Sequence, residues 1–107
     1  MAKQPAFTLS FAPEAIDHLD VIDSKFHGLL QRTIREKVIY TPTNETRNRK
    51  PLDQPAPFGA TWELRCGPSN RFQVFYAVDS AAQEVRVLAI GVKERNRLLV
   101  GGEEYQS

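Results

Sequence analysis

Cysteine is almost absent from this chain of 107 residues, in which Cys66 stands alone. A single cysteine cannot form a disulfide within the chain, and it cannot build a zinc site on paired cysteines. Long apolar runs are also missing: the most apolar stretch, Val85 to Val92, is interrupted by Arg86, and residues 1–10 lack the apolar run of a signal peptide. We therefore expect a cytoplasmic protein in a reducing setting, with no metal site and no contact with a membrane.

A large excess of charge of one sign is absent too, because 14 basic side chains face 13 acidic ones. With 41% hydrophobic and 25% charged residues, the composition is that of an ordinary globular domain. The charges are unevenly placed, however, since residues 32–97 hold twelve of the fourteen basic side chains against seven acidic ones. A locally basic middle is compatible with a phosphate-bearing partner and equally with a solvated surface.

Apolar periodicity predicts a single α+β domain over residues 1–107. Residues 7–11 alternate apolar and hydroxyl side chains, as a half-buried strand does. Pro13 can begin a first helix, and a second apolar stripe at helical spacing runs from Phe26 to Val38, which together predict a two-helix hairpin. Further strand signals lie at residues 60–66, 72–79 and 84–92. We expect an N-terminal strand, the helix hairpin and a three-stranded antiparallel meander, with the helices packed on one face of the sheet and the other face open.

Residues 41–59 contain four of the seven prolines and no periodic apolar pattern, so we expect a long loop without regular structure. Loops of this length in a small domain are commonly either disordered or functional. This one is Pro-rich and basic, and it carries Arg47, Arg49 and Lys50.

Strand alternation assigns side chains to the two faces of the predicted sheet. Trp62 and Leu64 share one face, which must be the face toward the helices, and Arg65 points to the other. In the next strand the larger apolar set has the parity of Phe72. If that set also faces the helices, Gln73 lies beside Arg65 on the open face.

Four stretches in the C-terminal half carry a resemblance to a known family. They read RKPL at residues 49–52, WELR at 62–65, FQVFYAVD at 72–79 and LAIGVKER at 88–95. Together with the order of elements over about residues 11–104, they resemble the RelE/ParE superfamily, the toxins of type II toxin–antitoxin systems. The resemblance implies a cognate antitoxin protein as partner. In the RelE branch it also implies the ribosome and mRNA as targets, with no cofactor.

RelE-like toxins cleave mRNA by attack of a ribose 2′-OH on the adjacent phosphate. This reaction needs a base for the hydroxyl, cations for the charge on phosphorus and an acid for the leaving oxygen. The resemblance implies catalytic roles for four basic residues: Arg65, Lys93, Arg95 and Lys50. It implies RNA contacts for four others: Arg47, Arg49, Arg71 and Gln73. We expect Arg71 to lie on the same strand face as Gln73 if the strand extends that far.

Several positions depart from the family's pattern. Gln73 stands in the place of an arginine, and Thr61 and Glu63 stand in the place of lysines. Leu99 stands where a late tyrosine is usual, and Tyr105 is the later candidate. These departures keep two other interpretations open: a ParE-type toxin that inhibits DNA gyrase without doing chemistry, and a non-toxic homologue that only binds an antitoxin-like partner.

The residues themselves allow structural roles for the same side chains. Arg65 can form an ion pair with Glu63 instead of binding phosphate, and Lys93 and Arg95 can lie in a solvated turn after the last strand. The two histidines are expected on the helix surface, away from the open face: His18 and His27.

Overall fold

The computed structural model describes residues 6–53 and 57–105. The N-terminal half consists of β1 (Thr8–Phe11), α1 (Pro13–Asp20), a 3₁₀ turn (Ser24–Phe26), α2 (His27–Thr33) and a π-helical turn (Ile34–Val38) that continues α2. The strands that follow are β2 (Arg49–Pro51), β3 (Trp62–Cys66), β4 (Phe72–Asp79), β5 (Glu84–Glu94), β6 (Arg97–Val100) and β7 (Glu103–Glu104). Short 3₁₀ turns at Pro57–Gly59 and Pro68–Asn70 precede β3 and β4.

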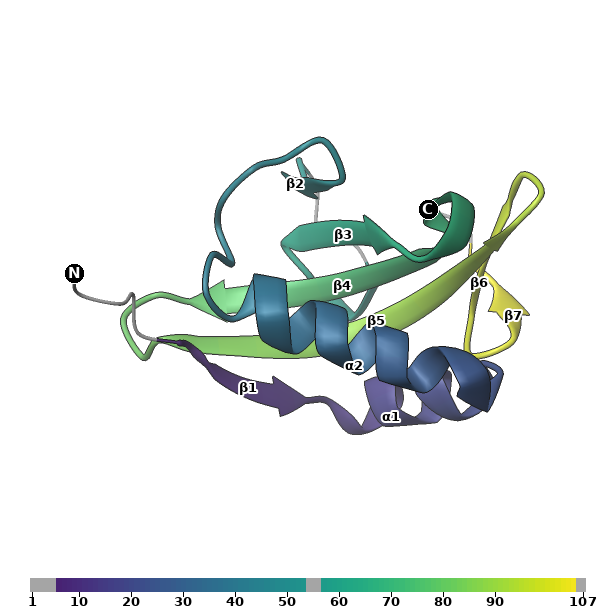
Figure 1. The fold of residues 1–107 in the computed structure, drawn as a ribbon, viewed down its shortest axis with the longest axis horizontal. Coiled ribbons are helices and arrows are strands. Elements are labelled where there is room, and N and C mark those ends of the chain that lie inside the picture. The colour runs from purple at the N-terminus through teal and green to yellow at the C-terminus, as the bar shows by residue number, and fades with distance from the viewer. Residues whose placement is uncertain (1–5, 54–56, 106–107) are drawn as a thin grey trace.

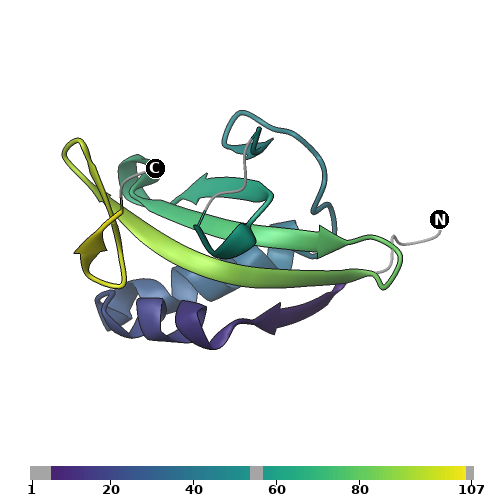
Figure 2. The same cartoon turned by 180° about the vertical axis from the view of Figure 1, so that it is seen from behind.

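The strands form one sheet in the order β2-β3-β4-β5-β6-β7, and β1 pairs with β5. Helices α1 and α2 lie on one side of this sheet (Figure 1), and in the opposite view the strands β4 and β5 pass in front of α2 (Figure 2). The predicted α+β class, with two helices and a mainly antiparallel sheet, is confirmed.

Three features of the sheet differ from the prediction. Strand β1 runs parallel to β5, so the sheet is mixed. Strand β2 lies inside the segment that was expected to lack regular structure and pairs with β3. Its three residues are too few for a recognisable alternation, and they end in Pro51, which an edge strand tolerates because no neighbour needs its missing N–H. The chain also continues beyond the predicted last strand, since β6 and β7 fold back beside the end of β5.

Helix α1 begins at Pro13, where the missing N–H removes no helical hydrogen bond. Its buried residues Ala15 and His18 share one face with Ile22, and this face packs toward the sheet. The next helical segment begins after Asp23, whose carboxylate accepts a hydrogen bond from the backbone N–H of Lys25. A short connection therefore reverses the chain direction between α1 and α2.

Apolar side chains are buried on both faces of the sheet. The larger core lies beneath the helices, where Leu30 and Ile34 pack with Val74 of β4. The smaller core lies on the opposite face and is formed by the buried residues Ala60, Phe75, Ala89 and Val100. Leu52 and Leu98 pack against it from the segment before β3 and from β6. The prediction of an open second face is therefore wrong over this part of the sheet.

An irregularity in the pairing of β4 with β5 keeps the two cores aligned. Phe75 lies opposite Ala89 and Tyr76 lies opposite Val87, so Leu88 is an extra residue in β5. Leu88 packs against the smaller core, whereas Val87 belongs to the larger one. The bulge thus lets an eleven-residue strand serve both faces.

The outer edge of β5 has three successive partners. Strand β1 pairs with residues 84–87, and β6 pairs with residues 91–94. Between them, Nδ1 of His18 accepts a hydrogen bond from the backbone N–H of Ile90 at 3.3 Å. The His18 ring also lies against the ring of Phe58, with centroids 5.3 Å apart.

His18 is only 7% exposed, so the expectation that it lies on the helix surface is wrong. The apolar face of α1 contains this position, and the imidazole supplies an acceptor that an apolar side chain lacks. His27 is half-buried rather than on the surface, with Nε2 2.8 Å from the carbonyl oxygen of Ile22.

Burial lowers the pKa of His18 below its ordinary value of 6.5, an effect that the nearby carboxylates of Asp17 and Glu14 partly offset. The unfolded chain therefore takes up a proton more readily, and stability should be complete above about pH 6.5 and fall as the pH drops. One such group changes the free energy of unfolding by at most about 1.4 kcal/mol per pH unit. Urea unfolding at pH 7.5 and 5.5 measures the loss.

The variant His18→Asn places a non-titrating oxygen near the position of Nδ1, so we expect a smaller loss of stability on acidification than in the wild type. His27→Gln serves as the matched control and should retain the wild-type dependence. An unchanged pH dependence in His18→Asn would rule out this role for the imidazole.

Candidate functional site

Cross-strand register gathers polar side chains on the sheet face opposite the helices. Lys50 of β2 lies opposite Glu63 of β3, and Arg65 of β3 lies opposite Gln73 of β4. The intervening Leu64 belongs to the core beneath the helices. The predicted position of Gln73 beside Arg65 is therefore confirmed.

A depression at the β2–β3 edge is lined by four basic residues, Arg47, Arg49, Lys50 and Arg65, together with the acidic residues Glu45 and Glu63. We call it the edge depression. Nε of Arg65 donates to Oε1 of Glu63 at 3.3 Å. The Arg65 side chain is nevertheless 44% exposed, whereas that of Glu63 is 9% exposed. The ion pair is therefore present, and it leaves part of the guanidinium accessible.

A second depression lies beside the turns that follow β3 and β5 and collects Arg71, Lys93 and Arg95 next to Ser69. We call it the turn depression. Lys93 is exposed and lies within β5, where its backbone N–H bonds to the carbonyl oxygen of Arg71 at 2.7 Å. Arg95 occupies the turn into β6 with a φ of +56°. This turn thus joins two strands rather than ending the sheet as predicted.

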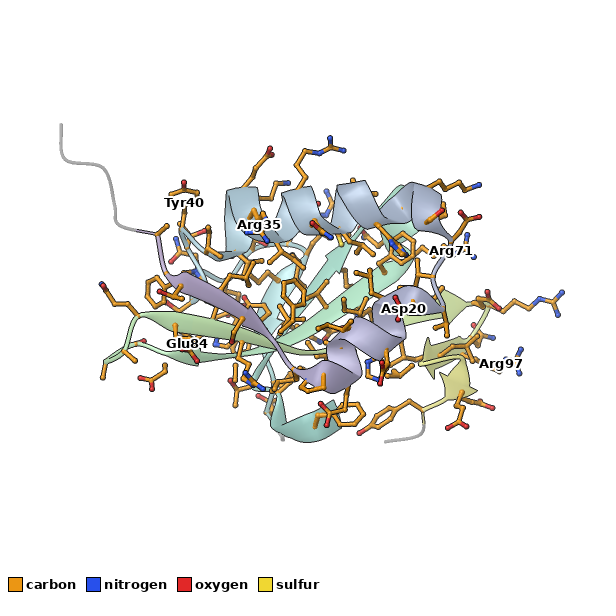
Figure 3. The ribbon with its side chains drawn as sticks, turned by 90° about the horizontal axis from the view of Figure 1, so that it is seen from below. Asp20, Arg35, Tyr40, Arg71, Glu84 and Arg97 are labelled. Carbon is orange, nitrogen blue, oxygen red and sulfur yellow. The ribbon has the colours of Figure 1, made fainter. Side chains whose placement is uncertain are left out.

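Arg71 does not share the strand face of Gln73, contrary to the prediction. Its backbone is helical, with φ −65° and ψ −30°, so strand alternation does not yet apply. Its guanidinium lies 5.8 Å from the ring centroid of Phe26 and 3.5 Å from the carboxylate of Glu94. Seen from the helix side, Arg71 lies at the end of the sheet near the start of α2 (Figure 3).

Gln73 lies between the two depressions but is not among the residues that line either. It is 8% exposed and pairs with Gly91 of β5. A Cβ atom on Gly91 would come within 2.7 Å of Leu98, so side chains of β6 cover this row. The side chain that was predicted to contact RNA is therefore mostly shielded.

Arg49 has a structural position and also lines the edge depression, so its predicted contact with RNA stays a prediction. It pairs with Leu64 on the helix side, is 6% exposed, and donates hydrogen bonds to the carbonyl oxygen and to the hydroxyl of Thr41. Nearby, the hydroxyl of Tyr76 donates to the carbonyl oxygen of Pro42 at 2.7 Å. Burial raises the pKa of Tyr76 to about 12, although Arg49 acts in the opposite direction. The two side chains anchor the start of the long loop.

The buried position of Arg49 predicts that its replacement lowers stability more than replacement of the exposed Arg47. Arg49→Ala should lower the free energy of unfolding by about 2 kcal/mol, because it removes a charge-assisted hydrogen bond to the partly buried carbonyl oxygen of Thr41. Arg47→Ala, in an exposed position two residues earlier, should change it by less than about 0.5 kcal/mol. Urea denaturation of both variants makes the comparison, and equal stabilities would contradict the structural role.

Neither Leu99 nor Tyr105, the two positions compared with the family's late tyrosine, places a phenol in the lining of either depression. Leu99 lines a groove on the helix side of the sheet. Tyr105 is half-buried against the smaller core, and its backbone N–H bonds to Leu98 at 2.8 Å. Thr61 is exposed directly before β3 and is not among the residues that line the two depressions.

An apolar groove lies between the end of α1 and the β5–β6 end of the sheet, and the sequence patterns did not reveal it. Ile22, Phe26, Val92 and Leu99 are among its lining residues. Val21, also in the lining, is 59% exposed. The sequence signal that could have pointed to the groove is the aliphatic residue Val21, which directly precedes Ile22 of the apolar face of α1.

Other kinds of chemistry find little support in the part of the chain that the structure describes. No group of three or more His, Cys, Asp and Glu side chains in residues 6–53 and 57–105 is arranged to hold a metal ion. Burial raises the pKa of Cys66 to about 11, so this thiol is not a thiolate nucleophile at neutral pH. Within the same ranges, no helix has the length and apolar character needed to cross a membrane.

Comparison with solved structures shows a similar fold in the crystal structure of the toxin–antitoxin complex RelBE2 from Mycobacterium tuberculosis. The match has a TM-score of 0.67 and covers 83% of this chain and 100% of the matched chain, at 18% sequence identity. No protein-family model and no curated protein sequence matches this chain. The structural likeness bears out the predicted RelE-like resemblance at the level of the fold.

Proposed function

We propose that this chain is the toxin of a toxin–antitoxin pair and cleaves mRNA on the ribosome. The observation that carries the proposal is the arrangement of basic side chains in the edge and turn depressions, at one end of a sheet with a RelE-like fold. Clustered cations of this kind bind successive phosphates of a nucleic acid and gain affinity by releasing counterions. A single strand of RNA that runs from the β2–β3 edge past Arg65 toward the turns that follow β3 and β5 would meet both depressions.

The reaction proposed is attack of a ribose 2′-OH on the adjacent phosphate. Arg65 binds the phosphate in the edge depression, because a guanidinium presents several donors in one plane and can hold two oxygens. Lys50 adds a positive charge from β2 on the same face. Lys93 and Arg95 hold a neighbouring part of the RNA in the turn depression. No step requires a metal ion or a cofactor.

The proposed antitoxin is a small protein that docks an apolar segment on the helix side of the sheet. The groove lined by Ile22, Val92 and Leu99 offers an apolar floor, and its charged lining residues are Asp23 and the ion pair of Arg71 with Glu94. A partner helix whose apolar face lies in the groove fits this lining.

A reconstituted translation assay tests the enzymatic proposal. Ribosomes translating a defined mRNA are mixed with the purified protein, and the new 5′ ends are mapped by primer extension. Arg65→Ala and Lys93→Ala should each reduce the cleavage rate about ten- to a hundredfold, the cost of losing a charge-assisted hydrogen bond of about 1.5–3 kcal/mol.

Arg86→Ala is the matched control, because Arg86 is an exposed basic residue near the opposite end of β5. This variant should cleave at the wild-type rate. If the mRNA stays intact with the wild type as well as with the variants, the endonuclease proposal is overturned. Inhibition of DNA gyrase supercoiling by the same preparation would then support the ParE-type alternative, which the shielded and neutral Gln73 favours.

A further inference from the structure

A carboxylate lies among the cations of the edge depression, and phosphate binding alone does not account for it. Glu63 is the second residue of β3, is 7% exposed, and lines the depression with Arg47, Lys50 and Arg65. A negative charge here repels an incoming phosphate and weakens the cationic site. A second carboxylate, that of Glu45, is exposed in the loop before β2.

The environment of Glu63 fixes the position of its carboxylate. β3 is held between β2 and β4, so the backbone at this residue is paired on both sides, opposite Lys50 and Phe75. The ion pair with Arg65 uses Oε1 of Glu63. Within the described part of the chain, this carboxylate accepts no other side-chain hydrogen bond. Oε2 is therefore free to accept a hydrogen bond from a group that enters the depression.

The same ion pair orients Arg65 for two tasks. Its Nε holds Glu63, while the terminal nitrogens of the half-exposed guanidinium stay available for a phosphate. A ribose next to that phosphate would then place its 2′-OH within reach of Glu63. Arg65 therefore holds the Glu63 carboxylate, which can accept a proton, next to the site where its own terminal nitrogens can bind a phosphate.

We propose that Glu63 is the general base of this site and accepts the proton of the attacking 2′-OH. This inference rests on the proposed ribonuclease function and adds to it a residue at a position where the family resemblance implied lysine. The 2′-oxygen loses its proton to Glu63 and forms a bond to phosphorus, and the bond from phosphorus to the 5′-oxygen of the next nucleotide breaks. That oxygen takes a proton from water, which leaves a 2′,3′-cyclic phosphate and a 5′-hydroxyl, and Glu63 returns its proton to solvent.

The test measures the single-turnover cleavage rate on the ribosome, and the affinity for the ribosome–mRNA complex, for the wild type, Glu63→Gln and Glu36→Gln. General-base catalysis contributes about a hundred- to ten-thousandfold, so Glu63→Gln should lose a rate factor of this order. Its affinity for the ribosome–mRNA complex should be unchanged or higher, because a negative charge is removed. Glu36→Gln removes the same charge from an exposed position in the π-helical turn, outside the lining of both depressions, and should keep the wild-type rate.

The split between rate and affinity separates a base from a residue that only holds Arg65. Loss of affinity in Glu63→Gln would overturn the proposal, and so would a rate within threefold of the wild type. Glu63→Asp provides the decision if Glu63→Gln does not fold: it retains a carboxylate, so it should cleave more slowly than the wild type at unchanged affinity, and a loss of affinity would overturn the proposal. A wild-type protein that cleaves nothing would instead refute the proposed function itself.

Discussion

The fold depends on the two edges of β5. Along its inner edge β5 pairs with β4, and along its outer edge it pairs in turn with β1, with the imidazole of His18 and with β6. Because an unpaired backbone N–H in a buried strand is costly, these partners must all be in place at once. This constraint fixes α1 against the sheet and brings β6 back across its end. The bulge at Leu88 then lets the same strand contribute to a core on each face.

The basic depressions follow from this arrangement. Since β6 and the segment before β3 cover the middle of the second face, polar side chains can reach solvent at the β2 edge and at the turns that follow β3 and β5. Lys50 and Arg65 line the edge depression, and Lys93 and Arg95 line the turn depression. A rigid sheet thus holds separate cations at fixed positions, as preorganised charge stabilisation requires.

Sequence patterns predicted what depends on local alternation, including the class of the fold and the placement of Gln73 beside Arg65. They did not predict the interactions that depend on contacts distant in the sequence. Arg49 is buried because β2 pairs with β3 across the proline-rich loop, and His18 is buried because Ile90 needs an acceptor. Arg71 turns toward Phe26 because its backbone is helical just before β4 begins.

The central claim is that the basic end of the sheet cuts translated mRNA. Sequencing of RNA 5′-hydroxyl ends after induced expression in a bacterium tests it most directly. The account predicts that growth arrest comes with new ends inside translated reading frames, and that these ends disappear when translation is blocked before induction. Growth arrest with intact mRNA would contradict it.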